Sequence, residues 1–116
     1  MIAALILAAL VAAPGPLPRT PVERQVLVDL AFTLGEQHAL HLKCAGADAD
    51  VWRRRMGDLV RYENPDEAFK TRLTSSFNAG FVARDAGART CDPAAERQAA
   101  EKGRGLARTL GSPTPR

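Results

Sequence analysis

The sequence is poor in aromatic residues and contains no stretch that alternates between apolar and polar side chains. Phe, Trp and Tyr together make up 5% of the 116 residues, whereas Ala, Arg and Leu are abundant. This mixture favours helices over sheets, because β-strands are enriched in aromatic and β-branched residues. The length suits one domain, and no internal repeat divides it. We therefore expect a single all-α domain.

The usual signatures of catalysis are also missing. The sequence has no glycine-rich loop after a strand, no carboxylate pair on an apolar surface and no assignable Ser-His-Asp set. Asp48 and Asp50 flank a turn, but they lack the further oxygen ligands of a calcium loop. The net charge is +3 with acids and bases interleaved, which is a weak indication of any anionic partner. We expect a protein that is not an enzyme, needs no cofactor and binds no nucleic acid.

Long apolar runs are limited to residues 1–13, MIAALILAALVAA, which carry no charge. As a helix this run would span roughly 20 Å, which is short of the roughly 30 Å hydrocarbon core of a membrane. It is typical of the apolar region of a signal peptide, although no basic residue precedes it and Pro14 is unfavourable for cleavage after Ala13. No cysteine directly follows the run, so we expect no lipoprotein anchor. We expect export to the periplasm and no membrane span once this leader is removed.

The helical domain is predicted to cover residues 21–110, after a Pro-rich connector (residues 14–20) that should be extended and solvated. Thr20, Pro21 and Glu23 have the spacing of a capping box with proline in the first turn, so a helix should follow to residue 44.

This first helix is apolar around most of its girth, so we expect it at the centre of a small four-helix bundle. Phe32 and Leu40 lie beside its polar side, and they would mark a partner or dimer face if they were exposed. On a helical wheel the apolar stripe contains Leu27, Leu30, Ala31, Leu34, His38, His41 and Leu42, and the polar side contains Gln25, Asp29, Thr33, Glu36 and Lys43.

Three shorter helices are predicted downstream, over residues 51–63, 65–88 and 93–110, and residues 111–116 should be a disordered tail. Asn64 is the expected cap of the third helix and Asp92 that of the fourth. The second helix has Trp52, Met56, Leu59 and Val60 on one face, and the fourth has a thin stripe of small residues (Ala95, Ala99 and Gly103).

Gly80 lies in the middle of the third helix, where glycine costs about 1 kcal/mol relative to alanine. Close approach of another backbone would compensate for this cost, and Gly35, which is also in mid-helix, marks the expected place of contact.

Cys44 and Cys91 stand at two corners between predicted helices. An even number of cysteines in an exported protein indicates a disulfide. This bridge would close a loop of roughly 50 residues and would stabilise the fold by roughly 4 kcal/mol. Catalytic redox cysteines are more often close together, as in Cys-X-X-Cys.

His38, His41 and Cys44 follow one another in steps of three along the first helix. Imidazole and thiolate are zinc ligands, which suggests a metal site. However, the histidine pair lacks the glutamate and the spacing of HExxH, and an oxidised Cys44 is not a ligand. Both histidines also fall on the stripe that should face the core. Structural histidines are therefore the first interpretation, and metal or small-ligand binding through His38 and His41 is the alternative.

Several landmarks together resemble an uncharacterised family of small exported alphaproteobacterial proteins, defined as a domain of unknown function. They extend over residues 22–110, and in order they are LGEQHALHLKC (34–44), Trp52 with Met56 and Leu59, FNAGF (77–81) and Cys91. The resemblance implies an exported, disulfide-linked helical domain and brings no activity.

Family members tend to carry an aromatic residue in place of Ala39 and a basic residue in place of His41, which weakens a metal site built on His41. His38, Asn78 and Gly80 match the family pattern, so a shared surface would lie near them. Our first hypothesis is a non-enzymatic periplasmic domain that binds another envelope protein or a second copy of itself.

Overall fold

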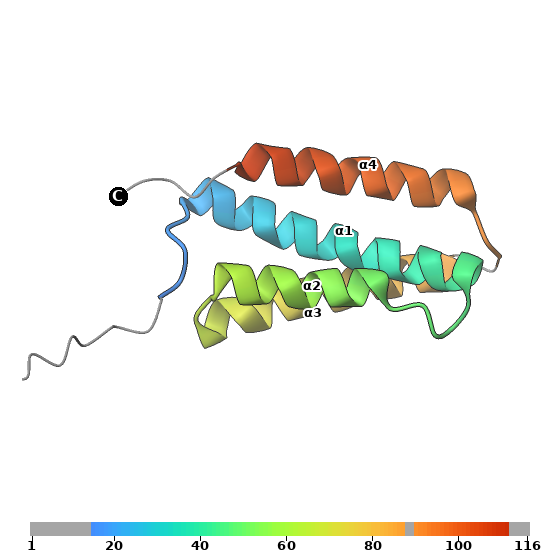
Figure 1. Ribbon diagram of the computed structural model, residues 1–116, viewed down its shortest axis with the longest axis horizontal. Helices are drawn as coiled ribbons and strands as arrows, with labels where there is room; N and C mark the ends of the chain where they lie inside the picture. Colours follow the sequence, from blue (N-terminus) through green and yellow to red (C-terminus); the bar gives the residue numbers. More distant parts are fainter. Residues whose placement is uncertain (1–14, 88–89, 112–116) are drawn as a thin grey trace, which may run out of the picture.

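The structure, a computed structural model, describes residues 15–87 and 90–111. These residues form four helices and no strand: α1 (Pro21–Ala45), α2 (Val51–Glu63), α3 (Glu67–Gly87) and α4 (Pro93–Leu110). Consecutive helices run in opposite directions, so α1 and α3 point one way and α2 and α4 the other (Figure 1). The predicted all-α, four-helix fold is confirmed. None of these helices is both long and apolar enough to cross a membrane, and the predicted leader lies outside the described residues.

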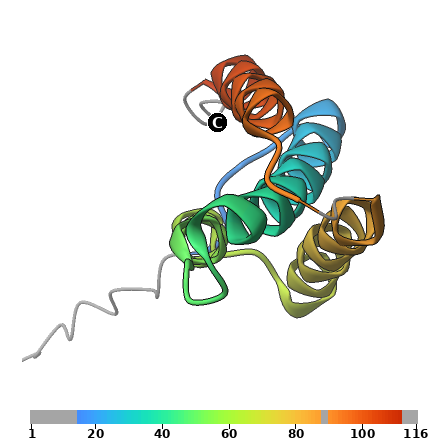
Figure 2. The ribbon, with the colours of Figure 1, turned by 90° about the vertical axis from the view of Figure 1, so that its right-hand side faces the viewer.

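Helix α1 is the centre of the domain, as its wide apolar surface predicts. It packs against each of the other three helices, which lie on three sides of it when the domain is viewed from one end (Figure 2). The buried cluster combines Leu27, Leu30, Ala31 and Leu34 of α1 with Met56, Phe69, Leu73, Phe77 and Leu110.

The backbones of α1 and α3 approach closely at Gly35 and Gly80. A Cβ atom on Gly35 would lie 1.9 Å from the carbonyl oxygen of Phe77, and one on Gly80 would lie 2.0 Å from that of Phe32. No side chain can occupy either position without moving a helix backbone. The predicted compensation for a mid-helix Gly80 is therefore confirmed.

The polar side of α1 is solvated only in part. Gln25, Asp29 and Lys43 are exposed, whereas Thr33 is fully buried and Glu36 is 7% exposed, because α3 and α4 extend over this part of the helix. Glu36 accepts hydrogen bonds from Arg84 Nε of α3 (2.8 Å) and from Lys102 Nζ of α4 (3.4 Å), so the carboxylate joins three helices. Leu40 is also buried, and the expectation that it could be exposed as a partner face is wrong.

The predicted capping box is confirmed at α1, and the predicted cap of α4 is confirmed as well. Thr20 Oγ1 accepts the Glu23 N–H (3.1 Å), and Glu23 Oε1 accepts the Thr20 N–H (2.9 Å). Asp92 caps α4 by accepting the N–H of Ala95 at 3.1 Å.

The predicted cap of α3, Asn64, is wrong. Asn64 ends α2 instead, with a left-handed backbone (φ 46°), which is incompatible with the extended conformation of an N-cap residue. Asp66 takes the role, and its Oδ1 accepts the N–H of Phe69 at 2.8 Å.

The Pro-rich connector is only partly solvated, contrary to expectation: Leu17, Pro18 and Arg19 are half-buried, whereas Gly15, Pro16 and Thr20 are exposed. Arg19 donates from Nε and Nη2 to the two carboxylate oxygens of Glu63, both at 2.8 Å, and the two side chains are 5% and 3% exposed. This hydrogen-bonded carboxylate raises the pKa of Arg19. Leu17 also donates its N–H to the Glu63 carbonyl oxygen at 3.1 Å. A bidentate pair is strong enough to hold the described part of the connector, residues 15–20, against the end of α2.

The predicted disulfide is confirmed. It joins Cys44 and Cys91, which are 47 positions apart, and it ties the end of α1 to the residue before the N-cap of α4. A covalent link over a loop of this length stabilises the fold by about 4 kcal/mol.

We expect Gly80→Ala to lower the free energy of unfolding by about 3 kcal/mol, at the upper end of the cost of overpacking, because the obstructing atoms are backbone. The matched control is Gly57→Ala in α2, where the nearest atom to an added Cβ is the tip of the flexible Arg61 side chain at 3.6 Å. This control should gain up to about 1 kcal/mol from helix propensity. Urea unfolding measures both; equal stability of the two variants would contradict the close contact.

Candidate functional site: the groove between α2 and α4

Helices α2 and α4 both pack on α1 but share no extensive contact with each other, and an open groove of about 430 Å³ lies between them. The floor is formed by α1 and the two walls by α2 and α4. The groove is lined by Leu30, Leu34, Gln37, Trp52, Arg55, Asp58, Leu59, Tyr62, Ala100, Gly103, Arg104 and Ala107.

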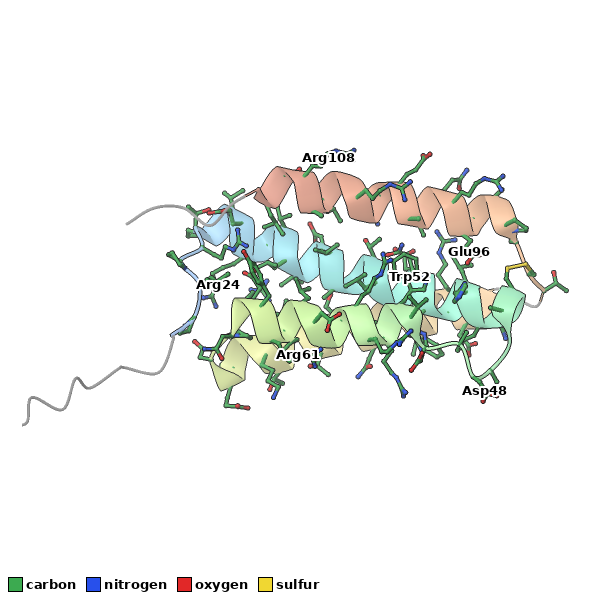
Figure 3. The ribbon with its side chains drawn as sticks, in the orientation of Figure 1. Arg24, Asp48, Trp52, Arg61, Glu96 and Arg108 are labelled. Atoms are coloured by element: carbon green, nitrogen blue, oxygen red, sulfur yellow. A yellow bond between two sulfur atoms is a disulfide. The ribbon has the colours of Figure 1, made fainter. Side chains whose placement is uncertain are left out.

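The lining residues recur at helical spacing on all three helices, so the groove follows the helix axes. The α2 wall is aromatic: Trp52 projects from α2 toward α1 (Figure 3), and Tyr62 at the other end is 62% exposed. The α4 wall carries small residues, so part of the predicted small-residue stripe faces this groove. The result is one bulky wall, one flat wall and an apolar floor.

The charges around the groove are predominantly positive. Arg55 holds its guanidinium 4.6 Å from the centre of the Trp52 ring, a cation–π contact, and forms no ion pair within the described residues. Arg104, on the opposite wall, likewise forms no ion pair among the described side chains. The one lining carboxylate, Asp58, is paired with Arg61. Two guanidinium groups therefore line opposite walls of the groove without an ion-pair partner among the described residues.

Two buried polar atoms beside the groove have no hydrogen-bond partner among the described residues. They are Oε1 of Gln37, whose residue is 2% exposed, and Nε1 of Trp52. Gly103 makes room for the Gln37 amide, since a Cβ at Gly103 would lie 3.1 Å from that Oε1. An unsatisfied buried polar group costs about 1–3 kcal/mol, so these two atoms, which are not accessible from the groove, lower the stability of the fold.

His38 faces α3. Its ring lies 5.9 Å from the ring of Phe77 and 5.4 Å from that of Phe81, and its Nδ1 is buried without a partner. Burial lowers the pKa of His38 below its ordinary value, and the nearby charges of Arg53 and His41 lower it further, against a smaller opposing effect of Asp50. A neutral imidazole packed on aromatic rings is a core residue.

His41 faces α4, where its Nδ1 lies 2.5 Å from Oε1 of Glu96. Glu96 extends from α4 toward α1 in Figure 3. The two histidines thus have different neighbours, Cys44 is oxidised, and the described residues contain no cluster of three or more His, Cys, Asp or Glu side chains that could hold a metal ion. The described chain offers the histidine pair no third ligand.

The three residues of the expected shared surface, His38, Asn78 and Gly80, lie in different environments. Gly80 is buried in the α1–α3 contact and His38 is partly buried, so only Asn78 is exposed. The groove itself was not predicted, because the sequence shows only that Trp52 and Leu59 share one face of α2 with Met56 and Val60. Tyr62 was the available signal for the groove. It extends the face of α2 that carries Trp52 and Leu59 by one turn beyond the residues that pack against the core.

The groove is lined by groups that can make hydrogen bonds, ion pairs and aromatic contacts. Its lining offers an amide, an indole, a phenol, two guanidinium groups and a carboxylate already paired with arginine. None of these is a nucleophile held against a general base.

Comparison with protein families identifies residues 21–112 as matching the model of a family described as a protein of unknown function, DUF2385. A search of curated proteins and a search of solved structures each give no match. Because the match covers most of the chain, this protein belongs to that family.

The pKa of His38 leads to a pH-dependent stability. Between this lowered pKa and the ordinary value of 6.5, the unfolded chain binds a proton that the folded protein does not. The contribution of His38 to the free energy of unfolding is therefore complete above about pH 6.5 and is lost as the pH falls below this value. We expect wild-type protein to lose stability relative to His38→Gln over this range in urea titrations at a series of pH values. Parallel profiles of stability against pH for the wild type and His38→Gln would contradict the lowered pKa of His38. The control variant His41→Gln keeps His38, so its stability should change with pH as it does in the wild type.

Proposed function

We propose that this protein is an exported, non-enzymatic domain of the bacterial envelope that acts by binding another protein in the groove between α2 and α4. The observation that carries this proposal is the composition of the groove. Trp, Tyr and Arg are the residues most enriched among binding hot spots, and here they surround an apolar floor. The groups that would contact a partner are held by well-packed helices, so little ordering is needed on binding.

Export is supported by the sequence of residues 1–13 and by the disulfide, since structural disulfides persist in oxidising compartments. The alternative, metal or small-ligand binding through His38 and His41, has weaker support because one imidazole packs on aromatic rings and the other bonds Glu96.

The proposed compartment is tested by the intact mass of the protein recovered from the envelope of its host under non-reducing conditions. We expect a mass without the leader, and lower by two hydrogens for the Cys44–Cys91 bridge. A full-length mass with both thiols free would contradict export.

The proposed interface is tested by photo-crosslinking in the same envelope. Benzoylphenylalanine replaces either Tyr62, at the edge of the groove, or Val82 on α3, which does not line it; the two residues are 62% and 63% exposed. We expect a discrete protein adduct from position 62 and none from position 82. No adduct at position 62, or the same adducts at both positions, would refute binding in the groove.

A further inference from the structure

The geometry points to an acidic amphipathic helix of the partner protein as the occupant of the groove. This inference rests on the proposed function and specifies the chemistry of the segment that binds. Two independent features carry it: the shape of the groove and the charge of its rim.

The shape fits a helix. The lining positions on α2 extend from Trp52 to Tyr62, which corresponds to about 15 Å or three helical turns. Along this length the α4 wall presents Ala100, Gly103 and Ala107, and small side chains allow another helix backbone to approach closely. Recognition of a helix in a groove places one row of side chains between the two walls. An acyl chain or similar small ligand would instead require an enclosed site that buries most of its surface.

The charge requires an acidic partner. Arg55 and Arg104 lie on opposite walls and lack ion-pair partners in the described structure, whereas Asp58 is already paired with Arg61. Carboxylates on both flanks of a bound helix would meet one arginine each, and charge-assisted hydrogen bonds to guanidinium groups are among the stronger polar contacts. A second copy of this chain fits poorly, because α2 and α4 both carry a net positive charge.

The test uses two synthetic peptides of about 14 residues, which exceed the roughly 15 Å of the groove by about one helical turn. They share a Leu and Ala stripe with no aromatic residue, and they differ in having Glu or Lys on the flanks. Trp52 is the only tryptophan of the chain, so its fluorescence reports occupancy, and calorimetry gives the dissociation constants. We expect the Glu peptide to bind saturably and at least about tenfold more tightly than the Lys peptide.

Matched variants test whether the rim arginines, Arg55 and Arg104, cause the preference for the Glu peptide. Arg55→Gln with Arg104→Gln should abolish the preference, whereas Arg97→Gln with Arg108→Gln removes the same charge from α4 positions that do not line the groove and should retain most of it. Equal affinities for the two peptides, or the same loss in both double variants, would overturn the inference.

The remaining outcomes separate this inference from the proposed function. Tighter binding of laurate than of either peptide, or a stable dimer that the Glu peptide does not dissociate, would overturn the acidic helix. A protein adduct at position 62 together with no preference for the Glu peptide would leave the proposed function intact and refute only the partner chemistry.

Discussion

The contact between Gly35 and Gly80 is the constraint from which much of the arrangement follows. Because neither residue has a side chain, α1 and α3 lie with their backbones in contact, and each helix must follow the other closely. This contact fixes the position of α3 on one side of α1. It also places Arg84 of α3 beside Glu36 of α1, where the carboxylate meets Lys102 of α4 as well.

The remaining helices are held to α1 by separate devices. The disulfide fastens the start of α4 to the end of α1, and His41 with Glu96 repeats that connection one turn away. Arg19 and Glu63 fasten the end of α2 to the segment before α1. Each device acts between α1, or the chain next to it, and one other helix. None of these three devices joins α2 to α4, which explains how a groove remains between them.

Such an arrangement is consistent with a protein that binds. Arg55 and Arg104 line the groove without ion-pair partners in the described structure, and the two unsatisfied buried atoms beside it lower the stability of the free protein. Proteins commonly accept a loss of stability at sites where function requires it. The covalent bridge at the opposite end of the groove from Tyr62 stabilises the fold by a comparable amount, so the fold can accommodate this loss.

The sequence by itself determined the helical class, the start of α1 at Thr20, the pairing of Cys44 with Cys91 and the close contact of Gly35 with Gly80. These depend on local propensity, on spacing and on rules with few alternatives. The cap of α3 was predicted wrongly as Asn64, because Asp66 is an equally good cap residue and only the left-handed turn after α2 excludes Asn64. The tertiary structure alone decided that Thr33 and Glu36 are buried, that Arg19 meets Glu63 and that a groove separates α2 from α4. A helical wheel shows which side chains share a face, but it contains no information about which neighbouring helix covers that face.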